Sequence, residues 1–323
     1  MRTEARFPAI ERQAGHYESF YLKACHPEGG RGVWIRYTVH KRPGEEPKGS
    51  IWFTLFGPDG PQAVKVTTED VTAPPERYIA IGPSWFGPET VQGSAAADSL
   101  EASWNLEYES PEEPLRHLPR GWMYRARVPR TKLLSPHPGA LFSGRVTVGG
   151  EQVSVERWPG MVGHNWGAEH AERWIWMHAS FHNPDGWLDA AIGRIRVGRW
   201  TVPWIANGAI SLDGRRHQLG GIERVRGTEI TETPTGADFV LPGKGIELRG
   251  RVSAPKERFV GWIYADPDGS EHNTVNCSVA DMELTVTRDD GPPVELRAAG
   301  MAAYELGMRE KDHGMDIQPF PDG

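Results

Sequence analysis

RWPGMVGHNWGAEHAERWIWMHASFHNPDGWLD, residues 157–189, carries four of the twelve histidines and five of the thirteen tryptophans of the chain. Within it, residues 174–182 alternate strictly, which predicts a strand whose successive side chains point to opposite faces. Residues 183–186, NPDG, predict a turn, after which a second strand places Asp189 opposite Ser180. The hairpin therefore presents one acid among imidazoles and indoles, on a face that carries Trp174, Trp176, His178, His182 and Trp187.

The same alternation recurs on both sides of this hairpin, for example in residues 33–39 and 51–56. Helical periodicity is nearly absent, no repeat of fixed period is visible, and 38 glycines and 27 prolines are scattered through the 323 residues. We predict an all-β fold of two antiparallel β-barrels or sandwiches. The expected domains are residues 1–157 and 158–307, followed by a loose tail at 308–323.

Charge and composition exclude several classes of partner. The net charge is −7 without a basic block, so nucleic acid and anionic membrane surfaces are poor partners. No run of about eighteen apolar residues predicts a membrane span, and the N-terminus lacks the apolar core of a signal peptide. With Cys25 and Cys277 alone, a reduced cytoplasmic protein is favoured over one disulfide between them. Most other histidines, His117 and His272 among them, are expected at the surface.

The imidazoles of the hairpin allow three interpretations. His178 and His182 are four residues apart, but on a strand that spacing is about 13 Å, too far for one metal ion. We therefore predict no metal and no cofactor. The two rings either hydrogen-bond inside a polar barrel interior or perform acid–base and ligand-orienting work. Similarly, residues 163–167, GHNWG, either form a structural corner plugged by Trp166 or aim His164 and Asn165 into a cavity.

Residues 163–167, followed by Trp174-Ile175-Trp176, resemble the H-N-W-G signature of the hydroxyneurosporene synthase (carotenoid 1,2-hydratase) and AttH-like family. Tocopherol cyclase carries a related N-W-G. Residues 15–23 resemble the opening strand of the family, and residues 277–282 with 303–305 resemble its closing strands. The resemblance thus touches the start, the middle and the end of the chain.

The resemblance implies two lipocalin-like barrels in tandem with a hydrophobic pocket. Known relatives add water to isoprenoid double bonds, cyclise prenyl phenols or close polyketide rings. Hydratase-type members usually have Asp before the His-Asn-Trp, where this chain has Gly163. If that Asp is their proton donor, its absence counts against carotenoid hydration specifically.

The working hypothesis is an enzyme of the lyase or isomerase type that hydrates, isomerises or cyclises an isoprenoid- or polyketide-like molecule with acid assistance. Asp189 or Glu18 would supply the acid, because burial among indoles keeps a carboxyl protonated. As an alternative, Glu18 is a solvated or salt-bridged strand residue. His164, Asn165, His178 and His182 would orient the substrate, and the pocket would be lined by Trp166, Trp174, Trp176, Trp187 and Tyr304.

Two rival functions remain open. The chain could be a non-catalytic carrier of a lipid or isoprenoid, or an interaction protein whose own tryptophans fill the interior. Each function leaves room for transient contact with a membrane, and the sequence does not indicate an oligomeric state.

Overall fold

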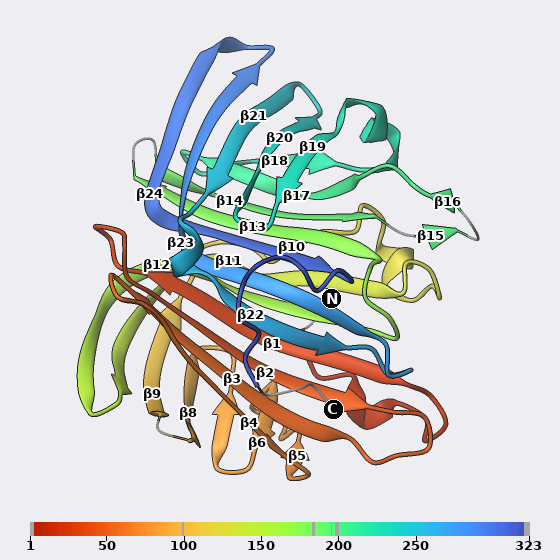
Figure 1. The fold of residues 1–323 in the computed structure, drawn as a ribbon. Helices are drawn as coiled ribbons and strands as arrows, with labels where there is room; N and C mark the ends of the chain where they lie inside the picture. The colour runs from red at the N-terminus through yellow and green to blue at the C-terminus, as the bar shows by residue number, and fades with distance from the viewer. Residues whose placement is uncertain (1–2, 99, 183–184, 195, 198–199, 320–323) are drawn as a thin grey trace.

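A computed structural model describes residues 3–98, 100–182, 185–194, 196–197 and 200–319. The described chain consists almost entirely of strands, with short 3-10 turns η1 (Phe7–Ala9), η2 (Gly121–Tyr124), η3 (Ile222–Gly227) and η4 (Lys256–Arg258). The strands form two large antiparallel sheets, each of which curls into a barrel (Figure 1). The prediction of an all-β fold with two tandem barrels is confirmed. None of the described helices is long and apolar enough to cross a membrane.

The first barrel contains twelve strands in the order β4-β3-β2-β1-β12-β11-β9-β8-β7-β6-β5, with β10 paired to β11. The sheet curls so that β4 packs against β8 and β9. Its strands are β1 (His16–Cys25), β2 (Gly32–Lys41), β3 (Lys48–Gly57), β4 (Gly60–Thr68), β5 (Val71–Thr72), β6 (Ile79–Ile81), β7 (Ser84–Phe86), β8 (Thr90–Ala97), β9 (Leu100–Glu109), β10 (Leu115–Arg116), β11 (Thr131–Val148) and β12 (Glu151–Gly167).

The second barrel contains ten strands in the order β18-β17-β14-β13-β24-β23-β21-β20-β19, with β22 paired to β23. A pairing of Leu219 with Gly243 joins β18 to β20 and closes it. Its strands are β13 (Arg173–His182), β14 (Asp185–Arg194), β17 (Ile205–Leu212), β18 (Arg215–Gly220), β19 (Glu229–Thr233), β20 (Gly236–Gly243), β21 (Ile246–Ser253), β22 (Val260–Ala265), β23 (Glu271–Arg288) and β24 (Gly291–Met308). A small separate ribbon pairs β15 (Arg196–Val197) with β16 (Trp200–Thr201).

The barrels pack against each other through strands that are buried on both faces. All ten residues of β1 are buried. Phe20, Leu22 and Ala24 belong to the core of the first barrel. The alternate residues face the second barrel, as the packing of Tyr21 against Trp176 shows. A strand covered on both sides must be apolar or hydrogen-bonded throughout, which is why its polar residues are expected to have specific partners.

The predicted hairpin forms, but with a different register and orientation. His178 pairs with Asp189 and Ser180 with Trp187, two residues from the predicted pairing. Because the difference is even, every side chain keeps its predicted face. The apolar face, including Ile175 and Met177, fills the second barrel. The polar face therefore does not line an enclosed chamber inside that barrel, but points outward into the interface between the barrels.

Two boundaries also differ from expectation. β12 runs through the expected domain boundary at 157/158 and pairs with β1 as far as Gly167, so the chain changes barrels between Gly167 and Arg173. The tail beyond Met308 is not loose throughout, since Ile317 bridges Gly261. Cys25 and Cys277 are both buried and free, so no disulfide joins them.

Candidate functional site

The predicted site residues do not converge on one point. They fall into separate buried groups, of which two contain the predicted acids. The first, here called the Asp189 cluster, comprises Asp189, His117, Ser135 and Trp176 and lies between the barrels. The second, here called the Glu18 cluster, comprises Glu18, His16 and His164 and lies at one end of the first barrel.

The Asp189 cluster joins β14 to the first barrel. Asp189 accepts hydrogen bonds from Ser135 Oγ (2.5 Å) and Trp176 Nε1 (3.2 Å). His117, which directly follows β10, places Nε2 3.4 Å from Asp189 Oδ2, while its Nδ1 donates to the carbonyl of Asn207 (3.2 Å). All four side chains of the cluster are buried. The cluster is therefore a polar cross-link between the barrels.

Electrostatics make Asp189 and His117 an ion pair. Burial raises the pKa of Asp189, but His117, His178 and Ser135 outweigh it and lower the pKa overall. Burial likewise lowers the pKa of His117, but the Asp189 carboxylate outweighs it and raises the pKa. Asp189 is thus an ionised acceptor at neutral pH, not the protonated acid that burial among indoles suggested.

The remaining residues on the polar face of the hairpin have separate surroundings. His178 Nε2 donates to the carbonyl of Pro138 (3.0 Å), and burial followed by the charge of Lys23 lowers its pKa to about 3. His182 is exposed and contacts the carbonyl of Pro27 (3.2 Å), so it lies outside every cluster. Trp187 packs with Leu115 and Ala209, apart from the hydrogen bonds of Asp189.

The Glu18 cluster is built from the two segments that resemble the family, β1 and the end of β12. Glu18 Oε1 accepts a hydrogen bond from His164 Nε2 (2.7 Å), and Oε2 lies 3.5 Å from His16 Nε2. The carboxylate also accepts the backbone N–H groups of Arg6 (2.8 Å) and Phe7 (2.8 Å). Glu18 thereby holds residues 5–14, here called the N-terminal arm, across the barrel end.

Hydrogen bonding controls the charge of this cluster. Burial raises the pKa of Glu18, but the neighbouring imidazoles of His16 and His164 outweigh it and lower the pKa to about 2. Burial lowers the pKa of His164, whose ring is stacked between Phe20 (centroids 4.1 Å apart) and Trp166 (4.5 Å). Glu18 is therefore an ionised carboxylate that orients two imidazoles.

A cavity of about 610 Å³ lies beside the Glu18 cluster and is here called the arm cavity. Its walls come from the N-terminal arm and from the two family-like segments. They include His16, Trp166, Gly167, Ala168, Ala5, Ala9, Ile10, Ala14 and Arg6. The buried Nε2 of His16 has no hydrogen-bond partner among the described residues and lies 3.5 Å from Glu18 Oε2, so no close hydrogen bond fixes this ring. The lining combines apolar side chains with one imidazole, as small-molecule sites do.

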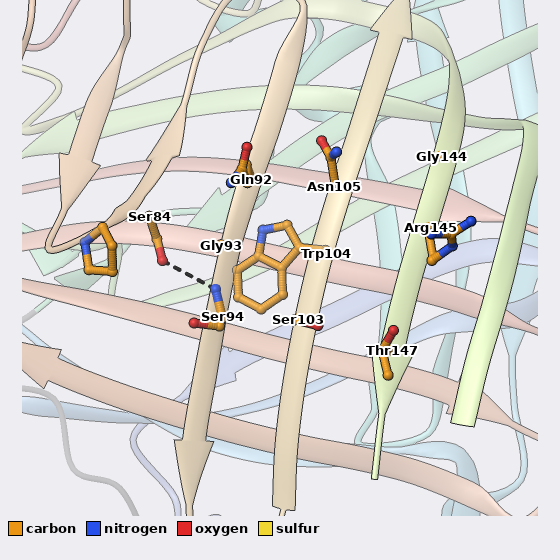
Figure 2. Close-up of a pocket in the computed structure, with 11 residues that line it drawn as sticks. Ser84, Gln92, Gly93, Ser94, Ser103, Trp104, Asn105, Gly144, Arg145 and Thr147 are labelled. Carbon is orange, nitrogen blue, oxygen red and sulfur yellow. Dashed lines mark hydrogen bonds between the residues drawn. The ribbon is translucent and has the colours of Figure 1, made fainter. Parts of the chain in front are cut away.

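A second cavity of about 590 Å³ lies on the first barrel along β8, β9 and β11 (Figure 2). It is lined mainly by amide, hydroxyl and guanidinium side chains around Trp104. The Ser84 hydroxyl there accepts the backbone N–H of Ser94 (3.2 Å). None of the predicted site residues lines this cavity.

Trp174 and Tyr304, two other predicted aromatic residues, form hydrogen bonds away from both clusters. Trp174 Nε1 donates to Glu305 Oε1 (3.0 Å), whose other oxygen accepts from Tyr264 (3.0 Å) and Asn276 (3.1 Å). Tyr304 is in the core of the second barrel and donates to the carbonyl of Thr233 (2.8 Å), so it does not reach either acid.

Gly163 and Asn165 of the GHNWG segment face the second barrel. The ring of Tyr21 fills the space above Gly163, where a Cβ would lie 2.1 Å from Tyr21 Cζ. This position therefore has no room for an Asp side chain. Asn165 Oδ1 is buried without a hydrogen-bond partner.

Sequence reasoning missed several buried polar residues. His117 and His272 were expected at the surface but are buried, and Ser135, also buried, carries no signal in the sequence. His117 follows a two-residue strand and carries no periodic signal. A third group, His170, Asp266 and His272, has its nitrogen and oxygen ligand atoms within 4.8 Å of one another, a spacing that could hold a metal ion. Only the folded arrangement brings these residues together.

Comparison with known proteins supports the fold. No model of a protein family matches the sequence. Uncharacterized proteins of Mycobacterium tuberculosis, from the strains CDC 1551 / Oshkosh and ATCC 25618 / H37Rv, are each 26% identical over 285 residues, 87% of this chain and 84% of theirs.

Two solved structures are similar over nearly the whole chain. An AttH-like protein of Nitrosomonas europaea has a TM-score of 0.54 at 13% identity, covering 95% of this chain and 97% of that one. Kievitone hydratase of Nectria haematococca has a TM-score of 0.54 at 10% identity, covering 92% and 89%. The chain therefore shares the tandem-barrel fold of these proteins, as the resemblance implied.

Proposed function

We propose that this chain is an acid–base enzyme that hydrates, isomerises or cyclises a hydrophobic isoprenoid- or polyketide-like molecule in the arm cavity. One observation carries the proposal: His16 lines this cavity while its Nε2 lies 3.5 Å from the ionised Glu18 carboxylate. A carboxylate beside an imidazole is the arrangement of a general acid–base pair.

His16 would act as the proton donor and acceptor, and the wall of the cavity would hold the substrate. His16 would donate the proton on Nδ1 to an alkene carbon, leaving a carbocation on the neighbouring carbon. Trp166, in the same wall, would pack against the hydrophobic substrate. Water would then add to the cation and return a proton to His16. In isomerisation or ring closure, loss of a substrate proton or attack by a substrate group would take the place of water.

The class of substrate follows from the lining and from the shared fold. Alanine and isoleucine side chains with one indole favour an apolar molecule, and about 610 Å³ suits a small one. A solved structure of the same fold is named for the hydration of kievitone. Arg6 and Glu4 at the rim would meet a polar end of the substrate.

Asp189 has a supporting role in this proposal. Its carboxylate is ionised, and Ser135, Trp176 and His117 surround it. None of these four residues lines the arm cavity. Asp189 would hold the barrels together, and the same applies to His178, which is bound to Pro138.

The test is to incubate the purified protein with a panel of prenylated phenols, linear isoprenoids and polyketides in heavy-oxygen and deuterated water. Mass spectrometry would detect hydration as incorporated oxygen and isomerisation as incorporated deuterium. His16→Gln should abolish turnover, with His182→Gln as a matched control because His182 is exposed and distant from both acids.

Two outcomes would count against the proposal. Full activity of His16→Gln would remove His16 from the chemistry. A ligand that binds the wild-type protein and is recovered without label would instead indicate the carrier function. Melting temperatures of both variants distinguish a lost catalytic group from a lost fold.

A further inference from the structure

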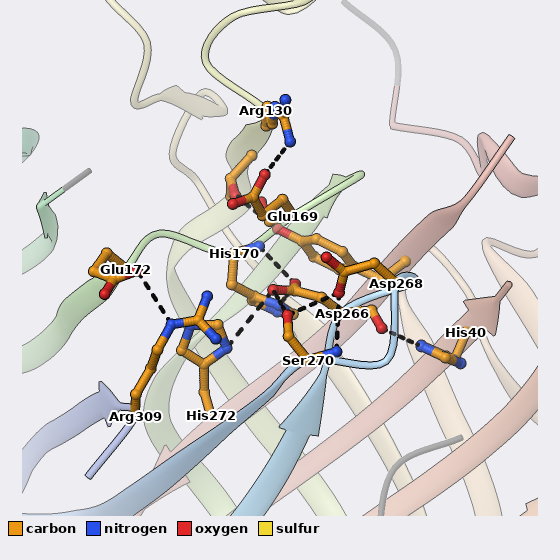
Figure 3. A network of polar contacts seen from close by, with 12 residues as sticks. His40, Arg130, Glu169, His170, Glu172, Asp266, Asp268, Ser270, His272 and Arg309 are labelled. Atoms are coloured by element: carbon orange, nitrogen blue, oxygen red, sulfur yellow. Dashed lines mark hydrogen bonds and ion pairs between the residues drawn. The ribbon is translucent and has the colours of Figure 1, made fainter. Parts of the chain in front are cut away.

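A compact group of two imidazoles and one carboxylate lies where the two barrels meet (Figure 3). None of these three residues lines the arm cavity. His170 belongs to the link between β12 and β13. Asp266 and His272 flank the turn between β22 and β23. His170 Nδ1 lies 2.7 Å from Asp266 Oδ1, and His272 Nδ1 lies 3.8 Å from Asp266 Oδ2.

The buried imidazoles of this group have unused ring nitrogens. His272 is fully buried, yet neither of its ring nitrogens has a hydrogen-bond partner among the described residues. Nε2 of His170 is also buried and unpartnered. Because buried polar atoms are nearly always satisfied in folded proteins, two imidazoles with unpartnered nitrogens beside one carboxylate point to a missing ligand.

The surroundings hold these side chains in place. Asp266 Oδ1 also accepts the backbone N–H of His170 (2.7 Å), and Ser270 Oγ donates to Oδ2 (3.3 Å). The His170 ring is stacked between Tyr17 (centroids 3.9 Å apart) and Trp174 (5.2 Å). Such outer contacts orient the ligands of metal sites and lower the reorganisation that binding requires.

We propose that His170, Asp266 and His272 bind one divalent transition-metal ion, with Zn²⁺ as the reference ion. Two imidazole nitrogens and one carboxylate oxygen suit zinc and its neighbours, whereas Mg²⁺ and Ca²⁺ prefer oxygen ligands alone. The ion would fasten the link between the barrels to the β22–β23 turn, which adds a structural site to the fold. This inference does not depend on the proposed function.

The sharpest variant is His272→Phe. Among the described residues His272 has no hydrogen-bond partner, and its ring packs edge-on against Trp174 (5.0 Å), so phenylalanine removes a metal ligand and leaves the packing nearly intact. Exposed His182→Phe is the matched control, since it also replaces an imidazole by a phenyl ring. Asp266→Asn is a second variant, which removes the carboxylate ligand and replaces it by a side chain of similar shape.

The experiment uses the full chain, first stripped with a chelator and then titrated with Zn²⁺ by calorimetry and with Co²⁺ by visible absorption. We expect one ion per chain, a Co²⁺ spectrum of low coordination number, and a melting temperature that rises with Zn²⁺. His272→Phe should weaken binding by about 100-fold and abolish the thermal shift, whereas His182→Phe should retain both. Absence of binding by the wild-type chain, or unchanged binding by His272→Phe, would overturn the proposal.

Discussion

Gly163 occupies a position where the ring of Tyr21 excludes any side chain. A Cβ at residue 163 would lie 2.1 Å from Tyr21 Cζ, so Gly163→Ala must displace a ring that packs edge-on against Trp176 (5.4 Å). We expect the free energy of unfolding to fall by about 1–3 kcal/mol, as for other overpacked interiors. Urea denaturation measures this change. Gly57→Ala, with no atom within 4 Å of its Cβ, should be nearly neutral; equal stability of the two variants would contradict the contact.

Asp189 balances the charge of a buried imidazolium between the barrels. Asp189→Asn keeps the shape but removes the charge that raises the pKa of His117, so burial then disfavours the protonated ring and the ion pair is lost. Removing one member of a buried pair destabilises a fold by about 3 kcal/mol or more. Chemical denaturation at neutral pH should show this loss. Asp238→Asn removes an exposed pair with Arg251 and should change stability far less; similar losses in both variants would refute the buried ion pair.

At the level of the element, alternation predicted the hairpin and the two faces of its strands, because a side-chain period of two survives any even shift of register. The register itself was wrong by two residues, since the NPDG sequence suggested a longer turn. Alternation also could not tell which face enters a barrel. That choice is decided by β24 and β17, which pair with the hairpin from distant parts of the chain.

The site residues that could be predicted are those marked by a local sequence pattern. Glu18 and His164 were selected from the two segments that resemble a family, and their contact at 2.7 Å joins those segments. Their separation of 146 residues hid the contact in the sequence. His117, Ser135 and Asp266 lie at strand ends or turns, where their burial depends on the second barrel.

The N-terminal arm is the element that covers the Glu18 cluster, and Phe7 fastens it. Phe7 is buried in the core of the first barrel, and its N–H donates to Glu18 (2.8 Å). Phe7→Ala should weaken the attachment of the arm by about 2 kcal/mol, which raises the detached fraction about 30-fold. Trypsin cleavage after Arg12 under native conditions reports that fraction. Ile10→Ala, at a partly exposed position, is the control; equal cleavage rates would show that Phe7 does not hold the arm.

At the level of the whole molecule, buried polar contacts tie the barrels into one unit. Lys23 Nζ donates to the carbonyl of Met301 (2.5 Å), Cys25 Sγ to that of Ser278 (3.0 Å), and His178 to that of Pro138 (3.0 Å). Each contact joins one barrel to the other. Separating the barrels would expose all of these groups, so we expect the two barrels to unfold together, and acid to act on both through their shared interface.

His178 should make this interface sensitive to acid. Its pKa falls from 6.5 to about 3 in the folded chain, because burial and then Lys23 disfavour the charged ring, against a smaller opposing effect of Asp189. Above pH 6.5 the ring is neutral in both states, so its contribution is constant. Between pH 6.5 and 3 the unfolded chain binds a proton that the folded chain does not. The free energy of unfolding therefore falls by about 1.4 kcal/mol for each unit by which the pH is lowered.

His178→Gln isolates this effect, because the amide can still donate to Pro138 but does not titrate. Other groups also lose stability in acid, Glu18 among them, since its pKa is lowered from 4.5 to about 2. Only the difference between variant and wild type therefore belongs to His178. Urea unfolding from pH 7 to pH 4 should show that the free energy of unfolding falls less steeply for His178→Gln than for the wild type. The difference in slope should correspond to about one proton taken up on unfolding. His182→Gln, at an exposed ring, should follow the wild type. Parallel curves for all three proteins would mean that His178 is not held neutral, and that acid separates the barrels through other groups.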